Sequence, residues 1–219
     1  MEPKASALQT YAVSLHFDKA GSAALSALMT CIAQASGNRY MQENGIPPHC
    51  TLGMFHAARA DEERIKAAVT AALTPALQDD CPSVGPPAAA AGGVLAPAGG
   101  PRFSRADTFR KKTLFLCPDA ESSAYLAALN QALHEGLLPL FAPACNRRYK
   151  PAAFFPHCAL ASGLSAQEMK KALSAVQKAP FPISAGAGSI ILAVRRPYEV
   201  VWEASFSTFP EPGNLSPTE

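Results

Sequence analysis

The stretch PHCTL at residues 48–52 recurs as PHCAL at residues 156–160. An Arg-Tyr pair stands shortly before each copy, at residues 39–40 and 148–149. A double match of this kind is far more specific than one histidine on one strand. It predicts a chain of two similar halves, each presenting a histidine at a corresponding place.

The segments around the two copies alternate between strand-like and helix-like patterns. Residues 9–18 alternate apolar and polar side chains, which predicts a half-buried strand, and residues 21–35 carry apolar residues at helical spacing. The same reasoning predicts further strands at 49–55, 113–117 and 154–161, helices over 61–77, 126–137 and 165–176, and a hairpin within 182–209. This order predicts an α+β fold.

The expected domain organisation is simple. Residues 1–210 are expected to form a single domain with two lobes, and residues 211–219 a flexible tail. Within the domain, 16 of the 21 residues from 81 to 101 are Pro, Gly or Ala, which predicts an irregular segment that carries no chemistry.

Composition excludes several function classes. Of the 219 residues, 48% are hydrophobic and 16% charged, and the net charge is +2, which fits neither a disordered acidic chain nor a polynucleotide coat with a long footprint. No run approaches the length of a membrane span, and the first residues do not resemble a secretory signal, so we expect a cytoplasmic protein. The six scattered cysteines are expected to be free thiols.

The small net charge conceals an uneven distribution. Residues 102–112 carry +4, residues 146–150 carry +3 and residues 195–196 carry +2, so the rest of the chain holds −7. This predicts a local basic zone near the second copy of the motif, on the scale of one phosphorylated end.

Strand geometry decides which side chains of the motif act together. Residues i and i+2 share a face, so His49 and Thr51 face one way and Cys50 faces the core, and His157 and Ala159 repeat this arrangement. A zinc site or a Cys nucleophile is disfavoured because each His and its neighbouring Cys point to opposite faces. Two imidazoles facing one cleft suit a reaction that needs a base and an acid near neutral pH, such as phosphodiester cleavage. The alternative is that both histidines are structural.

At these residues the chain resembles the 2H phosphoesterase superfamily, which is named for two His-x-Thr/Ser-x motifs. The resemblance covers most of the chain and includes the closing strand pair with its turn Arg196-Pro197-Tyr198. It implies a bilobal, two-fold pseudo-symmetric α+β fold in which two antiparallel sheets line a central cleft and the helices lie outside.

The resemblance also implies an activity. His49 and His157 would be the catalytic pair and Thr51 would hold a phosphate oxygen, in a metal-independent hydrolysis of a 2′,3′-cyclic phosphate of a nucleotide or RNA end. One histidine would take a proton from water while the other protonates the departing ribose oxygen. No cofactor or metal is implied, and a monomer without membrane association is expected.

Basic and aromatic residues near the motifs are candidates for substrate binding, because they could contact a phosphate or stack on a base. The alternative for each is ordinary packing or solvation. The candidates are Arg39, Tyr40, Arg148, Tyr149, Lys150 and Tyr198. His16, on the wetter side of the first strand, is a further candidate for the cleft.

One position departs from the superfamily pattern. Ala159 stands where Thr or Ser is expected, and loss of one phosphate-oxygen donor lowers a rate by roughly a hundredfold. Ser162 is not an obvious replacement because it would face away from His157 on a regular strand. The alternative function is therefore a protein that binds a phosphate ligand or RNA end with impaired or lost catalysis, and a third possibility is a purely structural protein.

Overall fold

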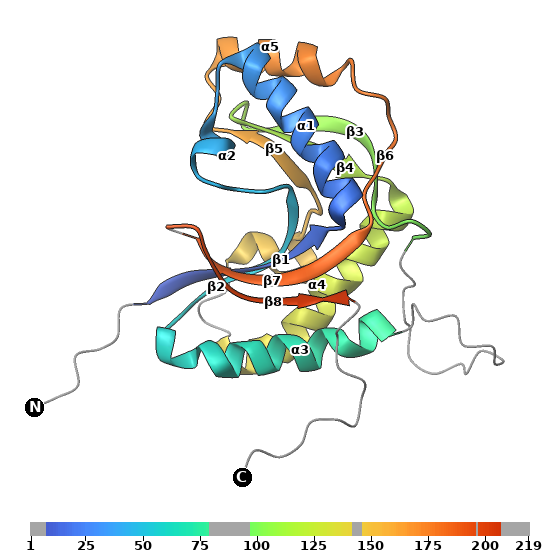
Figure 1. Cartoon of the computed structure of the whole chain (residues 1–219). Coiled ribbons are helices and arrows are strands. Elements are labelled where there is room, and N and C mark those ends of the chain that lie inside the picture. Colours follow the sequence, from blue (N-terminus) through green and yellow to red (C-terminus); the bar gives the residue numbers. More distant parts are fainter. Residues whose placement is uncertain (1–7, 79–96, 142–145, 196, 207–219) are drawn as a thin grey trace, which may run out of the picture.

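The computed structural model describes residues 8–78, 97–141, 146–195 and 197–206, in which one antiparallel sheet of eight strands carries helices on its outer side (Figure 1). The strand order is β6-β3-β4-β5-β2-β1-β7-β8. The strands are β1 (Gln9–Phe17), β2 (His49–Ala57), β3 (Arg102–Phe109), β4 (Thr113–Pro118), β5 (Cys158–Ser162), β6 (Ile183–Ser184), β7 (Ala187–Val194) and β8 (Glu199–Ser205). The helices are α1 (Lys19–Ser36), α2 (Tyr40–Glu43), α3 (Glu62–Gln78), α4 (Ala120–Phe141) and α5 (Ala166–Val176).

The expected pair of sheets is instead one continuous sheet. Four strands, β6-β3-β4-β5, meet the other four, β2-β1-β7-β8, at a seam where Cys50 pairs with Cys158. Both cysteines are free and buried, so the second residue of each His-Cys pair forms the join between the halves. The prediction of two sheets was wrong for this reason, and the two-fold relation between the halves stays a prediction.

The helices cross between the halves of the sheet. Helix α1 follows β1 in the chain but packs on α5 and β5, whereas α4 follows β4 but packs on α3 and β2. Figure 1 shows the pair α1 and α5 at one end of the molecule and the pair α3 and α4 at the other. Each half is therefore covered partly by a helix that follows a strand of the other half, which ties the described residues into one unit.

Local signals explain where α1 begins and ends and where α5 begins, whereas α4 extends beyond the predicted range of 126–137 at both ends. The Asp18 side chain accepts the Gly21 N–H at 2.6 Å at the start of α1, and Gly37, with φ of 83°, ends the helix in the left-handed conformation that glycine adopts easily. Ser165 and Glu168 form a capping box at the start of α5, the helix predicted over 165–176.

Two differences from the predicted elements have clear causes. Strand β3 was missed because Phe103 is its one buried residue, so it lacks regular alternation. Strand β5 begins at Cys158 rather than 154, because residues 151–153 form a 3₁₀ turn and residues 154–157 have no strand partner. The tail, and residues 81–96 of the segment predicted to be irregular, lie outside the described residues. No helix in the described part of the chain combines the length and apolarity that a membrane span requires.

Candidate functional site

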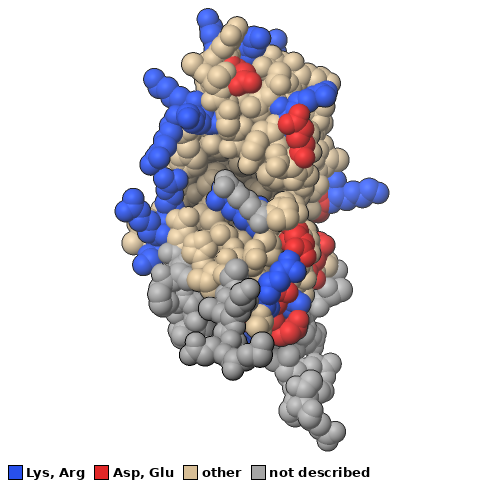
Figure 2. Space-filling model, turned by 90° about the vertical axis from the view of Figure 1, so that its left-hand side faces the viewer, with Lys and Arg blue, Asp and Glu red and all other residues tan. Residues whose placement is uncertain are grey.

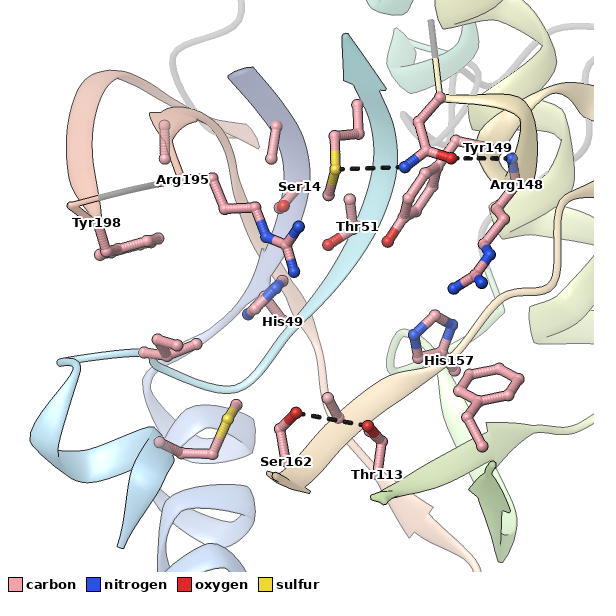
Figure 3. A pocket seen from close by; sticks show the side chains of 18 of the residues that line it. Ser14, His49, Thr51, Thr113, Arg148, Tyr149, His157, Ser162, Arg195 and Tyr198 are labelled. Carbon is pink, nitrogen blue, oxygen red and sulfur yellow. Dashed lines mark hydrogen bonds between the residues drawn. The ribbon is translucent and has the colours of Figure 1, made fainter. Parts of the chain in front are cut away.

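A cavity of about 630 Å³ lies over the seam between the two halves of the sheet, and both histidines of the repeated motif line it (Figure 3). This volume is within the range of pockets that hold small ligands. The motif cysteines lie on the opposite, buried side, as strand alternation predicted, and burial raises the pKa of the Cys158 thiol to about 12. The motifs therefore contribute two imidazoles and no accessible thiol to the site.

Strand register explains how the histidines meet. Cys50 pairs antiparallel with Cys158, so His49 and His157, which directly precede these cysteines, lie on opposite sides of the pair along the seam. Both histidines line the same cavity, one from each half of the sheet. Ala159 lies on the His49 side of the cysteine pair, so the second motif contributes no hydroxyl there, whereas Thr51 of the first motif lines the cavity.

Both imidazoles are held by a backbone carbonyl two residues earlier in the chain. The Nδ1 of His49 lies 2.8 Å from the Pro47 carbonyl oxygen, and the Nδ1 of His157 lies 2.8 Å from that of Phe155. A carbonyl only accepts a hydrogen bond, so in each ring Nδ1 carries the proton and donates. Each neutral ring consequently has its lone pair on Nε2, which is left to act as base or, when protonated, as acid.

Burial lowers the pKa of both histidines. For His49 desolvation is the main cause and the charge on His157 is a smaller one, opposed by the Pro47 carbonyl. For His157 desolvation is opposed by the Phe155 carbonyl. The influence of His157 on the His49 pKa is a second sign that the rings share one site, and both are biased toward the neutral form.

The neighbours of the two rings differ. His16, paired with His49 across β1 and β2, stacks on it with ring centroids 5.6 Å apart, and burial followed by the charge on His49 lowers the His16 pKa to about 4. His157 instead makes T-shaped contacts with two aromatic rings. Its ring centroid lies 5.0 Å from that of Phe109 and 5.4 Å from that of Phe115. His16 lines the cavity, so this sequence-based candidate does reach it.

Hydrogen-bond donors gather beside Thr51. Burial raises the pKa of the Tyr149 phenol, and the Thr51 hydroxyl, Arg195 and Arg148 lower it, so all three groups act on the phenol oxygen. Figure 3 shows Thr51 next to Tyr149, with the Arg148 side chain reaching toward His157 and that of Arg195 toward His49. Two guanidinium groups and two hydroxyls are therefore available to an anion in this part of the cavity.

Matched β-bulges change which residues face the cavity. In β2 the register skips Leu52, and in β5 it skips Leu160, which holds the equivalent place three residues after the histidine. Each extra residue reverses the alternation of the side chains that follow it. As a result, Met54 lines the cavity in the first half and Ser162 lines it in the second. The expectation that Ser162 faces away was wrong because it assumed a regular strand.

A buried asparagine holds the first bulge in place. The Nδ2 of Asn130 on α4 donates to the Leu52 carbonyl at 2.6 Å and to the Tyr149 carbonyl at 2.8 Å. A bulge removes a carbonyl from the strand ladder, and a buried carbonyl needs a donor. Asn130 thus connects the strand that carries His49 and Thr51 to the segment that carries Tyr149.

Replacing Asn130 by leucine is expected to lower the free energy of unfolding by roughly 2 kcal/mol, because two buried carbonyls lose their shared donor. Gln131→Leu is the matched control, since the exposed Gln131 amide bonds to Glu135 on the same helix. Denaturant unfolding of both variants measures the difference. Equal stabilities for the two variants would contradict the role given to Asn130.

Most of the predicted site residues line the cavity, and two do not. Those that line it are His49, Thr51, His157, Tyr40, Arg148, Tyr149 and Tyr198. Arg39 and Lys150 are exposed and lie outside it. Each caps a short helical turn, and the adjacent residues Tyr40 and Tyr149 line the cavity instead. The Tyr198 hydroxyl is buried and has no partner among the described residues.

Sequence reasoning missed several lining residues, among them Ser14, Arg110, Lys112, Thr113 and Arg195. Ser14 pairs with Thr51 in the strand register and so shares its face. The alternation of β1 could have revealed Ser14, and the basic clusters could have suggested the three cations. No signal in the sequence links Thr113 with Ser162, which the bulge brings together.

The cavity is electropositive. Its lining includes Arg110, Lys112, Arg148 and Arg195 and contains no Asp or Glu. Figure 2 shows a hollow midway along one face of the molecule, with Lys and Arg side chains inside it and along one edge and with Asp and Glu at the other edge. Such a lining favours an anionic ligand. Among the described residues, no group of three or more His, Cys, Asp or Glu side chains is arranged to hold a metal ion.

Comparison with known proteins gives one family. Residues 99–199 match the model of the 2'-5' RNA ligase superfamily. This region, slightly less than half of the chain, is similar to that superfamily. The 2'-5' RNA ligase superfamily is the 2H phosphoesterase superfamily, to which the paired histidine motifs also point. The matched region contains His157 and the strands β3, β4 and β7. A comparison with curated proteins finds no match. The match to the 2'-5' RNA ligase superfamily suggests enzymatic activity on RNA or nucleotides.

Proposed function

We propose that this protein is a metal-independent phosphodiesterase that hydrolyses a 2′,3′-cyclic phosphate of a nucleotide or RNA end. The observation that carries the proposal is the pair of imidazoles, His49 and His157. Both have Nδ1 held by a backbone carbonyl two residues earlier, and both line one electropositive cavity. Two Nε2 atoms on one cavity face suit a reaction that takes one proton and gives another.

The chemistry follows from these groups. Water attacks the phosphorus while Nε2 of one neutral imidazole accepts its proton. The bond from phosphorus to the ribose 3′ oxygen breaks, and Nε2–H of the other, protonated imidazole donates to that oxygen, leaving a 2′-phosphate. Thr51, Arg148 and Arg195 would stabilise the charge that grows on the phosphoryl oxygens.

The alternative is a protein that binds a phosphate ligand or RNA end without turning it over, which the alanine at position 159 favours. Ala159 lies on the His49 side of the cysteine pair, so the second motif contributes no hydroxyl there. On the other side, Thr51 and Tyr149 lie near two guanidinium groups. We therefore expect turnover with reduced stabilisation beside His49.

The test is hydrolysis of nucleoside 2′,3′-cyclic phosphates in the presence of a metal chelator. Wild type is expected to release the 2′-phosphate, and Ala159→Thr is expected to raise kcat by about tenfold or more because it restores a donor. Ala159→Val is the control, since it adds nearly the same volume without the hydroxyl. Tight binding without turnover in wild type and in Ala159→Thr would favour the binding protein instead.

A further inference from the structure

The turn of the β3–β4 hairpin consists of three consecutive cations, Arg110, Lys111 and Lys112. Arg110 and Lys111 have φ angles of 49° and 55°, in the left-handed region that costs an ordinary residue roughly 1–2 kcal/mol. Asn-Gly is the usual sequence for such a turn. Among the described residues none of the three takes part in an ion pair, so these charges have no structural partner there.

Two of these cations line the catalytic cavity. Arg110 and Lys112 belong to its lining, whereas Lys111 between them does not. The hydroxyls of Thr113 and Ser162, which follow the hairpin and the second bulge, also line it and lie 3.4 Å apart. Two cations and two half-buried hydroxyls thus meet in one part of the cavity.

This cluster is separate from the donors around Thr51. Figure 3 shows Thr51 and Tyr149 on one side of the two histidines and the Thr113–Ser162 pair on the other. Ser162 is the last residue of β5 and His157 directly precedes its first residue, so the two side chains are at opposite ends of this strand. A group bound there would belong to the same ligand but would not be the reacting phosphate.

We infer that Arg110, Lys112, Thr113 and Ser162 form a second phosphate subsite, and that the substrate carries a further phosphate besides the cyclic one. This inference rests on the proposed function. Cations with neighbouring hydroxyl donors are the usual partners of phosphate oxygens. The second phosphate is either a terminal 5′-phosphate or an internal phosphodiester of a short RNA end. An unphosphorylated nucleoside cyclic phosphate would leave the subsite empty.

The test compares ligands that resemble the product and need no turnover. They are adenosine 2′-monophosphate, adenosine 2′,5′-bisphosphate and an adenosine dinucleotide with a 2′-phosphate end and a free 5′ hydroxyl. Calorimetry is expected to show that wild type binds at least one of the two larger ligands about tenfold or more tightly than the monophosphate. Preference for the bisphosphate identifies a terminal phosphate, and preference for the dinucleotide an internal one.

Three variants locate the effect. Arg110→Asn and Lys112→Gln are expected to bring the ratio of affinities for the preferred larger ligand and the monophosphate close to one. Lys111→Asn is expected to keep the ratio of wild type. Asn tolerates the left-handed conformation of both turn residues, so Arg110→Asn and Lys111→Asn are matched in charge and backbone. An equal loss in Arg110→Asn and Lys111→Asn would indicate a general charge effect and overturn the subsite.

The result also separates this inference from the proposed function. If wild type binds all three ligands equally well, the second subsite is wrong and the histidine site is unaffected. If wild type binds none of them, the proposed function itself is contradicted. A preference for a larger ligand in a protein that does not turn over cyclic phosphates would support the subsite alone.

Discussion

Replacing His49 or His157 by alanine is expected to lower kcat on a nucleoside 2′,3′-cyclic phosphate by about 10²–10⁴-fold. Each substitution removes one of the two Nε2 atoms that line the cavity. KM is expected to change much less, because Thr51, Arg148 and Arg195 remain to bind the phosphate. Initial rates at saturating substrate measure the effect.

His56→Ala is the matched control for these variants. His56 lies on the same strand as His49 but is exposed, and its ring contacts Thr10 rather than the cavity. The double variant of His49 and His157 is expected to be little slower than either single variant, because the two groups act as a unit. Rates that stay within a few-fold of wild type in both single variants would contradict the assignment.

Replacing Thr51 by valine is expected to lower kcat by about a hundredfold, the usual effect of removing one preorganised donor at a developing charge. The change keeps the shape of a β-branched side chain and removes the hydroxyl that lines the cavity and acts on the Tyr149 phenol. The effect is expected to be large because Ala159 offers no second hydroxyl from the motifs. Comparison of kcat for the variant and wild type checks it.

Two further substitutions sharpen the Thr51 test. Thr51→Ser keeps the hydroxyl and is expected to retain most of the activity. Thr10→Val makes the same chemical change on the neighbouring strand, where the side chain contacts exposed His56 outside the cavity. A Thr51→Val enzyme as active as Thr10→Val would show that the hydroxyl does not contribute.

The sequence predicted which side chains of each motif share a face, because this depends on local rules. Strand alternation was enough to place His49 and Thr51 on one face and Cys50 in the core, and the burial of Cys50 and Cys158 confirms it. The start of α5 at its capping box and the end of α1 at Gly37 are likewise set by adjacent residues. Patterns confined to a few residues were therefore sufficient for most elements.

Features that depend on distant partners could not be predicted. The bulge at Leu160, which turns Ser162 toward the cavity, shows only in the register against β4. Strand β3 has an irregular pattern because it pairs with a two-residue strand on one side, and its side chains remain largely exposed. The joining of the halves into one sheet depends on a single cysteine pair, which no sequence period reveals.

The most direct test of the central claim is the pH dependence of kcat/KM for wild type and for the two single histidine variants. One histidine must be neutral and the other protonated, so wild type is expected to give a bell-shaped profile. Because burial lowers both pKa values, the centre of the bell is expected below about pH 6.5, the ordinary histidine value. Each variant is expected to lose one limb, and the two variants opposite limbs. A profile that is flat from about pH 5 to about pH 8, or a bell that keeps both limbs in both variants, would contradict a two-histidine mechanism.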